Sequence, residues 1–381
     1  RPPRSTLFPY MTLFRSGQSS NAAKMAYFVI ILFLFDTIYT SFNLNYNAQW
    51  SEMFTSVKDR SEVGELRGIF VICSLIFAFI LPTILIEDLT NQYNYDYTPS
   101  QYVLVGVIAS IVILISYFIV LKYGVIQRAE FINDAETAPS FIESIKYTFK
   151  NKAFLPFLVA ALATWICNGI LPTMIPYFAT YVLRIADENS MLIGAMLAAG
   201  FIVGAASMPL WMKIRQAKGT RFTGIVIFIF WAISLLIFMS TTTFAAAFGA
   251  MLFMGLGLGG SIYFYDQCIV EIIDEDEIQY GTRRAGAYYG VVSFIIRLSG
   301  VINFLVIGII FSGTEWATYN PNPGVDVIVG IKFLIGIFPA IVLGIGLIGL
   351  LIYPIKGKRL EEDRRKLDEL HQKKLQTAGT K

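Results

Sequence analysis

The stretch Glu271–Gly290, EIIDEDEIQYGTRRAGAYYG, contains the transition on which the expected fold depends. An apolar run ends here in five carboxylates, two adjacent arginines follow, and a second apolar run begins. The flanking runs, Phe244–Tyr265 and Ala285–Phe311, are each long enough to cross a hydrocarbon core of about 30 Å as a helix. Unpaired carboxylates are too costly in lipid, so we interpret this stretch as an aqueous loop between two membrane spans. Arg283 and Arg284 indicate that the loop is cytoplasmic.

Composition indicates a membrane protein along the whole chain. Hydrophobic residues make up 55% of the 381 residues, charged residues only 15%, and the mean hydropathy is +0.60. A soluble domain of this length does not need so much apolar surface. The net charge of +3 does not indicate nucleic-acid binding, because the basic residues fall at span ends and in the tail. Cys73, Cys167 and Cys268 lie in or beside apolar runs, so we expect buried thiols rather than a disulfide framework or a metal site.

Apolar runs of spanning length recur nine times. Lysine and arginine are concentrated in alternate connections between them, and Arg184 is the one exception in the other connections. By the positive-inside rule this places the C-terminus in the cytoplasm and the residues before Met25 outside. We therefore expect an all-α, multi-pass protein of the cell membrane, inner or plasma, with about nine transmembrane helices. The runs are Met25–Tyr46, Gly68–Glu87, Tyr102–Leu121, Ala153–Val182, Ser190–Met212, Phe222–Ser240, Phe244–Tyr265, Ala285–Phe311 and Gly330–Tyr353.

The first residues differ from the rest of the chain. Residues 1–16, RPPRSTLFPYMTLFRS, have neither the apolar core nor the cleavage site of a signal peptide. Thr6–Ser16 resembles the translation of a widely used sequencing adapter, and we interpret residues 1–16 as a non-native segment.

Three stretches together resemble the glycoside/pentoside/hexuronide cation symporters of the major facilitator superfamily, which include melibiose permease. They are YTSFNLNYNAQWSEMFTSVKDRSEVGELRG, NKAFLPFLVAALATWICNGILPTMIPYFATYVL and DEDEIQYGTRRAGAYYG, and the resemblance covers about residues 21–354. It implies a major facilitator fold of two six-helix halves that lacks its first three helices. The implied parts are a remnant of the N-terminal half at 21–122, a cytoplasmic connection at 123–152, the six-helix C-terminal half at 153–354 and a charged cytoplasmic tail at 355–381.

Polar residues inside the spans are candidates for a substrate site, because leaving such groups against lipid costs several kcal/mol. Asn43 and Asn47 share one helix face, and a tyrosine in a cavity can stack on a sugar ring. The resemblance adds Tyr39 and Thr40, which match the family's Tyr-Thr pair, and it places Arg297 where the family has a lysine. The predicted substrate-binding residues are Tyr39, Thr40, Asn43, Asn47, Tyr177 and Arg297.

Structural alternatives exist for several of these groups. Asp36 and Asn45 are as consistent with hydrogen bonds between neighbouring helices as with a cavity. Arg297 is consistent with a structural ion pair to Asp36 or Asp266. Tyr177 and Tyr181 are also consistent with an interfacial aromatic belt.

Opposite charges lie at equivalent connections of the two implied halves. Arg60 and Arg67 match two arginines of the family's fourth-to-fifth helix loop, and the carboxylates of the opening stretch lie between the tenth and eleventh helices. We hypothesise a cytoplasmic gate in which Asp274 or Asp276 pairs with Arg60 or Arg67 in the outward-facing state. Solvated carboxylates that only terminate a helix are the alternative. The predicted gate residues are Arg60, Arg67, Asp274, Asp276, Arg283 and Arg284.

Two patterns are not interpreted as sites. Gly255-x-Gly257-x-x-Gly260 fits a dinucleotide-binding fingerprint, but it lies inside an apolar span without a preceding strand, so we expect close helix packing there and at Gly344, Gly346 and Gly349. His371 lies in a highly charged segment that we expect to be a solvated helix. We find no arrangement typical of an enzyme.

The resemblance implies a secondary transporter that works by alternating access, with Na⁺ or H⁺ coupled to uptake of a sugar or glycoside. The alternatives are a lysolipid or other amphiphile symporter, and a receptor or scaffold that keeps the fold without transport. We expect a monomer in the bilayer with a small-molecule substrate and no cofactor. Because the family's cation-site carboxylates lie on the helices that the chain as written lacks, we do not expect it to catalyse coupled uphill transport.

Overall fold

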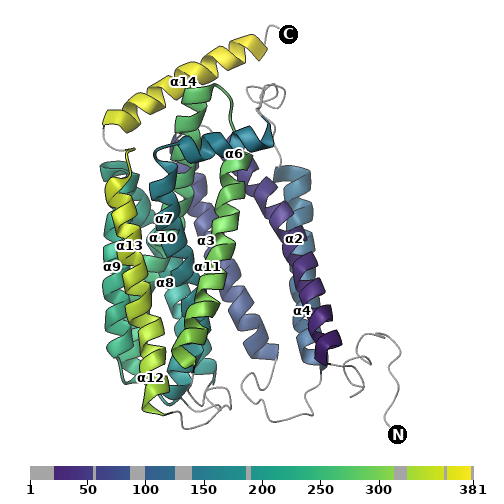
Figure 1. The fold of residues 1–381 in the computed structure, drawn as a ribbon, viewed down its shortest axis with the longest axis vertical. Helices are drawn as coiled ribbons and strands as arrows, with labels where there is room; N and C mark the ends of the chain where they lie inside the picture. The colour runs from purple at the N-terminus through teal and green to yellow at the C-terminus, as the bar shows by residue number, and fades with distance from the viewer. Residues whose placement is uncertain are drawn as a thin grey trace.

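The computed structural model describes residues 21–54, 57–85, 99–124, 140–185, 190–312, 324–355 and 358–378. Every regular element in these residues is a helix, and nine helical spans in them are long and apolar enough to cross a membrane (Figure 1). The predicted all-α, multi-pass fold is therefore confirmed. The spans are α2 (Asn21–Met53), α3 (Val57–Leu85), α4 (Pro99–Ile119), α7 (Phe154–Tyr181), α8 (Ser190–Lys218), α9 (Thr220–Ser240), α10 (Phe244–Tyr280), α11 (Ala285–Phe311) and the continuous α12 (Val325–Lys332) and α13 (Phe338–Ile352).

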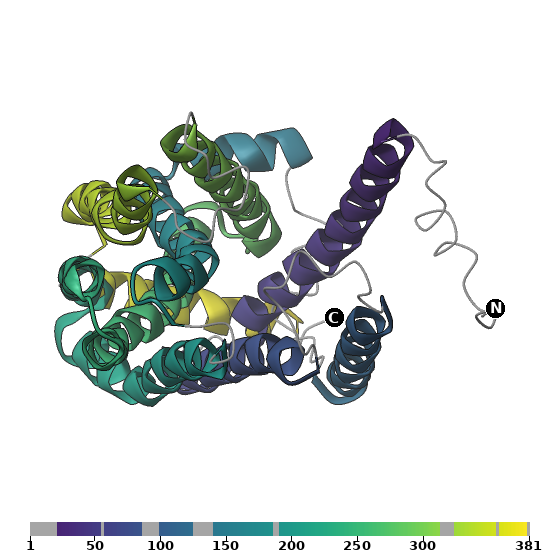
Figure 2. The ribbon, with the colours of Figure 1, turned by 90° about the horizontal axis from the view of Figure 1, so that it is seen from below.

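Helices α7 to α13 pack into one bundle, α2 and α3 lean against one side of it, and α4 packs on α3 (Figures 1 and 2). Helix α3 packs along α8, while α2 contacts the bundle chiefly through α11. The most apolar parts of α2 and α4 bury no residue, whereas that of α7 is mostly buried. The core of the protein therefore lies within α7 to α13.

Glycines allow α8 and α10 to approach closely. A β-carbon on Gly255 would overlap the carbonyl oxygen of Gly200, and one on Gly259 would overlap that of Gly204. Only glycine lets the two backbones come this close. The expectation that the fingerprint-like glycines serve helix packing is therefore confirmed for Gly255.

Packing explains the other glycines of these patterns except one. A β-carbon on Gly260 would lie 2.8 Å from a side-chain carbon of Ile227, and one on Gly349 would lie 2.6 Å from the carbonyl oxygen of Pro156. The side chains of Trp231 and Phe228 occupy the space beside Gly257 and Gly346. Gly344 has open space around it, so the packing expectation is wrong at that position.

One end of the bundle, which we call the charged end, carries the turn 281–284 and two helices outside the spans, α6 (Phe141–Lys150) and α14 (Lys358–Ala378) (Figure 1). Helix α6 starts at a capping box, in which Glu143 accepts a hydrogen bond from the backbone N–H of Ser140 at 3.1 Å. Its buried face, including Thr148, packs on α11. Helix α14 lies across the same end.

The structure corrects the interpretation of Glu271–Gly290 as a loop. Helix α10 continues past Tyr265 to Tyr280, so all five carboxylates lie on its last turns. Gly281, with a φ of 77°, ends the helix in the left-handed conformation that favours glycine. The helix persists because the carboxylates have cationic partners on neighbouring elements, so they need no aqueous loop.

Two burial expectations are also wrong. His371 is 8% exposed rather than solvated, because one face of α14 packs on the charged end. Cys73 is exposed, because its face of α3 points away from the bundle, whereas Cys167 and Cys268 are buried free thiols as expected.

We predict that Gly259→Ala destabilises the protein by about 1–3 kcal/mol, because the added methyl group must push α8 and α10 apart. Thermal unfolding in detergent measures the change. Gly344→Ala is the matched control, since it adds the same methyl group to a helix where nothing lies within 4 Å. Equal unfolding temperatures for the two variants would contradict the packing argument.

Candidate substrate cavity and charged end

A cavity of about 530 Å³ lies between the bundle and the helices that lean against it, α2 and α3. It brings together most of the predicted substrate-binding residues. Tyr39, Thr40, Asn43 and Asn47 reach it from α2, and Arg297 reaches it from α11. Its size is within the range of about 300–1,000 Å³ typical of ligand pockets.

Tyr177 is the predicted substrate residue that the structure does not bring to this cavity. Its ring stacks on that of Tyr181, with centroids 6.5 Å apart and the planes 4° from parallel. Asn45 also lies outside the lining, and its amide donates to the carbonyl of Ser41 at 2.8 Å within α2. The residues of α7 that line the cavity run from Thr164 to Ile175, so the lining ends two residues before Tyr177.

Asn43 and Asn47 lie on one face of α2, as predicted, and we call this the amide face. Asn47 donates through Nδ2 to Oδ1 of Asn43 at 3.1 Å, and its own Oδ1 accepts a hydrogen bond from Nη2 of Arg67 on α3. The predicted helical spacing of Asn43 and Asn47 is therefore confirmed as a contact. This face and Arg67 form one hydrogen-bonded group at the cavity wall.

Arg297 links α11 to α2. It forms an ion pair with Asp36, donates to Oγ1 of Thr40 at 2.8 Å, and lies 5.7 Å above the ring of Tyr39. The ion pair to Asp36 considered from the sequence is thus present, and both partners remain almost half exposed. Arg297 lies in the lining, so the pair and a role in substrate binding are compatible.

A second ion pair, between Arg67 and Asp266, joins α3 to α10. Nη1 of Arg67 lies 3.5 Å from Oδ2 of Asp266, and both side chains line the cavity while they are mostly buried. Sequence reasoning missed this pair, because it assigned Arg67 to a loop and to other carboxylates. The available signal was a carboxylate directly after the apolar run Phe244–Tyr265, five residues before the acidic stretch begins at Glu271.

Polarity changes along the cavity in the same direction on three helices. On α3, Arg67 lies nearer the charged end than Val71 and Leu75, since the helix starts at that end. On α7, the residues nearer that end are Thr164, Trp165 and Asn168, and those farther away are Leu171, Pro172 and Ile175. On α10, Tyr265 and Asp266 lie nearer that end, and the apolar residues Met251, Met254, Leu258 and Ile262 lie farther away. The wall that these three helices form therefore changes from polar to apolar with distance from the charged end.

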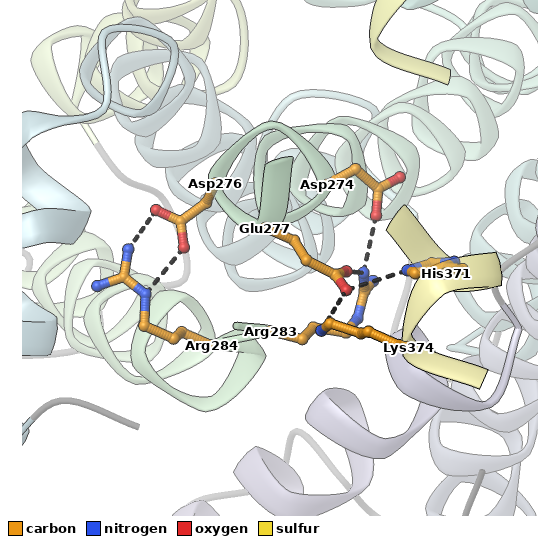
Figure 3. Close-up of polar contacts among 7 residues, drawn as sticks. All are labelled: Asp274, Asp276, Glu277, Arg283, Arg284, His371 and Lys374. Carbon is orange, nitrogen blue, oxygen red and sulfur yellow. Dashed lines mark hydrogen bonds and ion pairs between the residues drawn. The ribbon is translucent and has the colours of Figure 1, made fainter. Parts of the chain in front are cut away.

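At the charged end, Glu277 is the centre of a buried cluster (Figure 3). Its Oε2 accepts from Nη1 of Arg283 at 2.6 Å, and its Oε1 lies 3.0 Å from both Nε2 of His371 and Nζ of Lys374. Burial disfavours the charged guanidinium, but Asp274 and Glu277 together raise the pKa of Arg283 above its ordinary value. Glu277 thereby connects α10, the following turn and α14.

Three other carboxylates of α10 are also paired with arginines, and Asp274 shares Arg283 with Glu277. Asp274 accepts from Arg283 at 3.0 Å, and Asp276 forms a two-armed ion pair with Arg284 (Figure 3). Glu271 pairs with Arg215 of α8 at 2.9 Å. Arg283 and Arg284, in the turn after α10, thus bind carboxylates at the C-terminal end of that helix.

Among the side chains that the structure describes, the hypothesised pairs of Arg67 with Asp274 or Asp276 are not formed. Asp274 and Asp276 are engaged by Arg283 and Arg284, and Arg67 contacts Asp266 instead. The side chain of Arg60 lies outside the described residues. The gate therefore stays a prediction for another conformation.

Comparison with known proteins gives the chain a family context. A sequence profile of the family described as MFS/sugar transport protein matches residues 5–357. The match begins inside residues 1–16, so the interpretation of that segment as adapter-derived stays a prediction.

Individual relatives are remote. An uncharacterized symporter of Synechocystis is 20% identical over 86% of this chain and 74% of its own. The sodium-dependent lysophosphatidylcholine symporter 1 of Mus musculus is 20% identical over 94% and 71%, and a sphingosine-1-phosphate transporter of Xenopus tropicalis is 23% identical over 75% and 56%. These relatives are transporters by name, and none is similar enough for its substrate to be assigned to this chain.

We predict that Glu277→Gln loosens α14, because it leaves Arg283, His371 and Lys374 without the buried negative charge between them. Losing one partner of a buried ion pair costs about 3–5 kcal/mol. Hydrogen exchange across residues 358–378 measures the effect and is expected to become faster. Glu369→Gln is the control, since its ion pair with Arg365 is long, 3.9 Å, and largely exposed. Unchanged exchange in Glu277→Gln would show that the cluster does not hold α14.

Proposed function

Since the chain belongs to the MFS/sugar transport protein family, we propose that it is a secondary transporter of single-chain amphiphiles with a phosphate-bearing headgroup. Transport occurs by alternating access and is coupled to a cation. The names of two kinds of relative include molecules of this chemistry, lysophosphatidylcholine and sphingosine-1-phosphate. The charged end faces the cytoplasm in this proposal, as its arginines indicate.

The polarity change along the cavity supports this proposal most directly. An amphiphile in the cavity places its headgroup beside Arg67, Asn47 and Asn43, and its chain along the apolar residues of α7 and α10. Burying the chain is favourable at about 0.8 kcal/mol for each methylene group. A sugar presents hydroxyl groups around its ring and only its two faces to an apolar wall, so it gains less from such a wall than an alkyl chain does.

The guanidinium of Arg67 supports a negative charge in the headgroup. Its Nη1 is buried and makes no hydrogen bond to any of the described residues, although the carboxylate of Asp266 lies 3.5 Å away. An unsatisfied buried donor is costly, and a phosphate oxygen satisfies it with a charge-assisted hydrogen bond.

A sugar or glycoside is the second candidate. The amides of Asn43 and Asn47 with Tyr39 supply donors and acceptors suited to hydroxyl groups, and the family description names sugar transport. The open cavity disfavours a scaffold that keeps only the fold, because such a protein has no reason to preserve a pocket of this volume.

We predict that the protein in lipid nanodiscs binds lysophosphatidylglycerol with a dodecanoyl chain at least about tenfold more tightly than dodecyl maltoside, which has a similar chain and a neutral sugar head. A tenfold preference corresponds to about 1.4 kcal/mol, which one charge-assisted hydrogen bond supplies. Displacement of a fluorescent fatty amphiphile measures both affinities.

Arg67→Gln is expected to remove this preference and to leave maltoside binding unchanged. Lys218→Gln is the control, because Lys218 is an exposed cation at the end of α8, outside the cavity lining. Tighter binding of the maltoside to the wild-type protein would contradict the phosphate proposal and favour the sugar.

A further inference from the structure

Asp266 has an unusual position in the cavity. It is a carboxylate within the apolar part of α10, about 21 Å of helix from the charged end, and 11% of its side chain is exposed. Its single ionic partner among the described residues is Arg67, and no hydrogen bond to its carboxylate is formed there. The charge of Asp266 is therefore balanced by one guanidinium at a long distance.

Arg67 is held in place independently of Asp266. Asn47 accepts from its Nη2, and the rings of Trp50 and Tyr46 lie 4.9 Å and 5.6 Å from its guanidinium carbon. These contacts fix the guanidinium from the α2 side. Arg67 therefore keeps its position when its pairing with Asp266 changes.

The ionisable groups around Asp266 come from few elements. Helix α3 contributes Arg67, α11 contributes Tyr289 and α10 itself contributes Tyr265, all of which line the same cavity. The acidic end of α10 has its own partners, since Arg215 of α8 pairs with Glu271. No other cation in the described residues forms an ion pair with Asp266.

An anionic headgroup on Arg67 changes this balance. Before binding, one positive and one negative charge cancel. After binding, two anions share one guanidinium in a mostly buried site, and an uncompensated buried carboxylate takes up a proton rather than stay charged. Protonation of Asp266 restores neutrality.

We propose that Asp266 is a proton-binding site, and that it takes up one proton from solvent when an anionic headgroup binds to Arg67. The proton bonds to a carboxylate oxygen of Asp266, the ion pair to Arg67 is lost, and the headgroup takes the position beside Nη1. The site is neutral before and after, so substrate and proton move together. This inference rests on the proposed function, because it requires an anionic substrate.

Proton uptake by the wild-type protein is the first test. The probe is dodecanoyl lysophosphatidylglycerol, whose phosphodiester does not titrate near neutral pH, and the protein is in nanodiscs in weakly buffered solution with a pH-indicator dye. We expect about one proton taken up for each molecule bound, and an affinity that falls by up to about tenfold per pH unit as the pH rises.

Asp266→Asn tests the assignment to this residue, because an amide imitates the protonated carboxyl. We expect it to bind lysophosphatidylglycerol without proton uptake and with an affinity independent of pH. Asp266→Glu is expected to restore the uptake, and it keeps the test informative if the asparagine variant folds poorly. Asp326→Asn, at an exposed carboxylate outside the cavity, is the matched control and is expected to behave as wild type.

The outcomes separate the two proposals. Absence of lysophosphatidylglycerol binding to the wild-type protein overturns the proposed function, and the proton site with it. Binding without proton uptake overturns the proton site alone. Uptake that persists in Asp266→Asn also overturns it, because another group then carries the proton.

Discussion

Charge pairing along α10 is the interaction on which the rest of the structure depends. Each carboxylate that the helix carries into a buried position meets an arginine from a different place in the chain: Asp266 meets Arg67 of α3, and Glu271 meets Arg215 of α8. At its end, Asp274, Asp276 and Glu277 bind the arginines of the turn before α11, and Glu277 also holds α14. Because an unpaired buried carboxylate is costly, these pairs fix both the length of α10 and the elements beside it. One helix thus positions the cavity wall and the charged end.

Sequence patterns predicted the spans well, because a helix that crosses lipid must satisfy its own backbone and present apolar side chains throughout. Ala285–Phe311 was predicted to the residue, and α7 to within one residue at each end. Two of the misses lie where charge pairing, rather than hydropathy, decides the structure. The continuation of α10 beyond Tyr265 and the burial of His371 depend on partners far away in the sequence. Hydropathy and local spacing carry no information about such partners.

The candidate site shows the same division. The contact between Asn43 and Asn47 followed from helical spacing alone, and the ion pair of Arg297 with Asp36 was one of two alternatives that the sequence left open. Tyr177 lies two residues beyond the last residue of α7 in the lining, Ile175, because the sequence does not show how far the cavity extends along a helix. The pairing of Arg67 with Asp266 depends on how α3 crosses α10, which no local pattern encodes. Residues that share a face were thus predictable, and residues that meet across helices were not.

The two ion pairs that connect the leaning helices to the bundle have opposite polarity. α2 and α3 contribute Asp36 and Arg67, and α11 and α10 contribute Arg297 and Asp266. In the proposed transport cycle, movement of α2 and α3 against the bundle separates both pairs, and the free-energy cost differs between the two. Asp36 and Arg297 are half exposed and regain solvation when their pair opens, so separating them costs little free energy. The pair of Arg67 and Asp266 is mostly buried, so its opening requires that another charge or a proton replace each lost partner. A ligand shifts a conformational equilibrium only through its different affinity for the two states, and the buried pair is where a charged headgroup gains that difference.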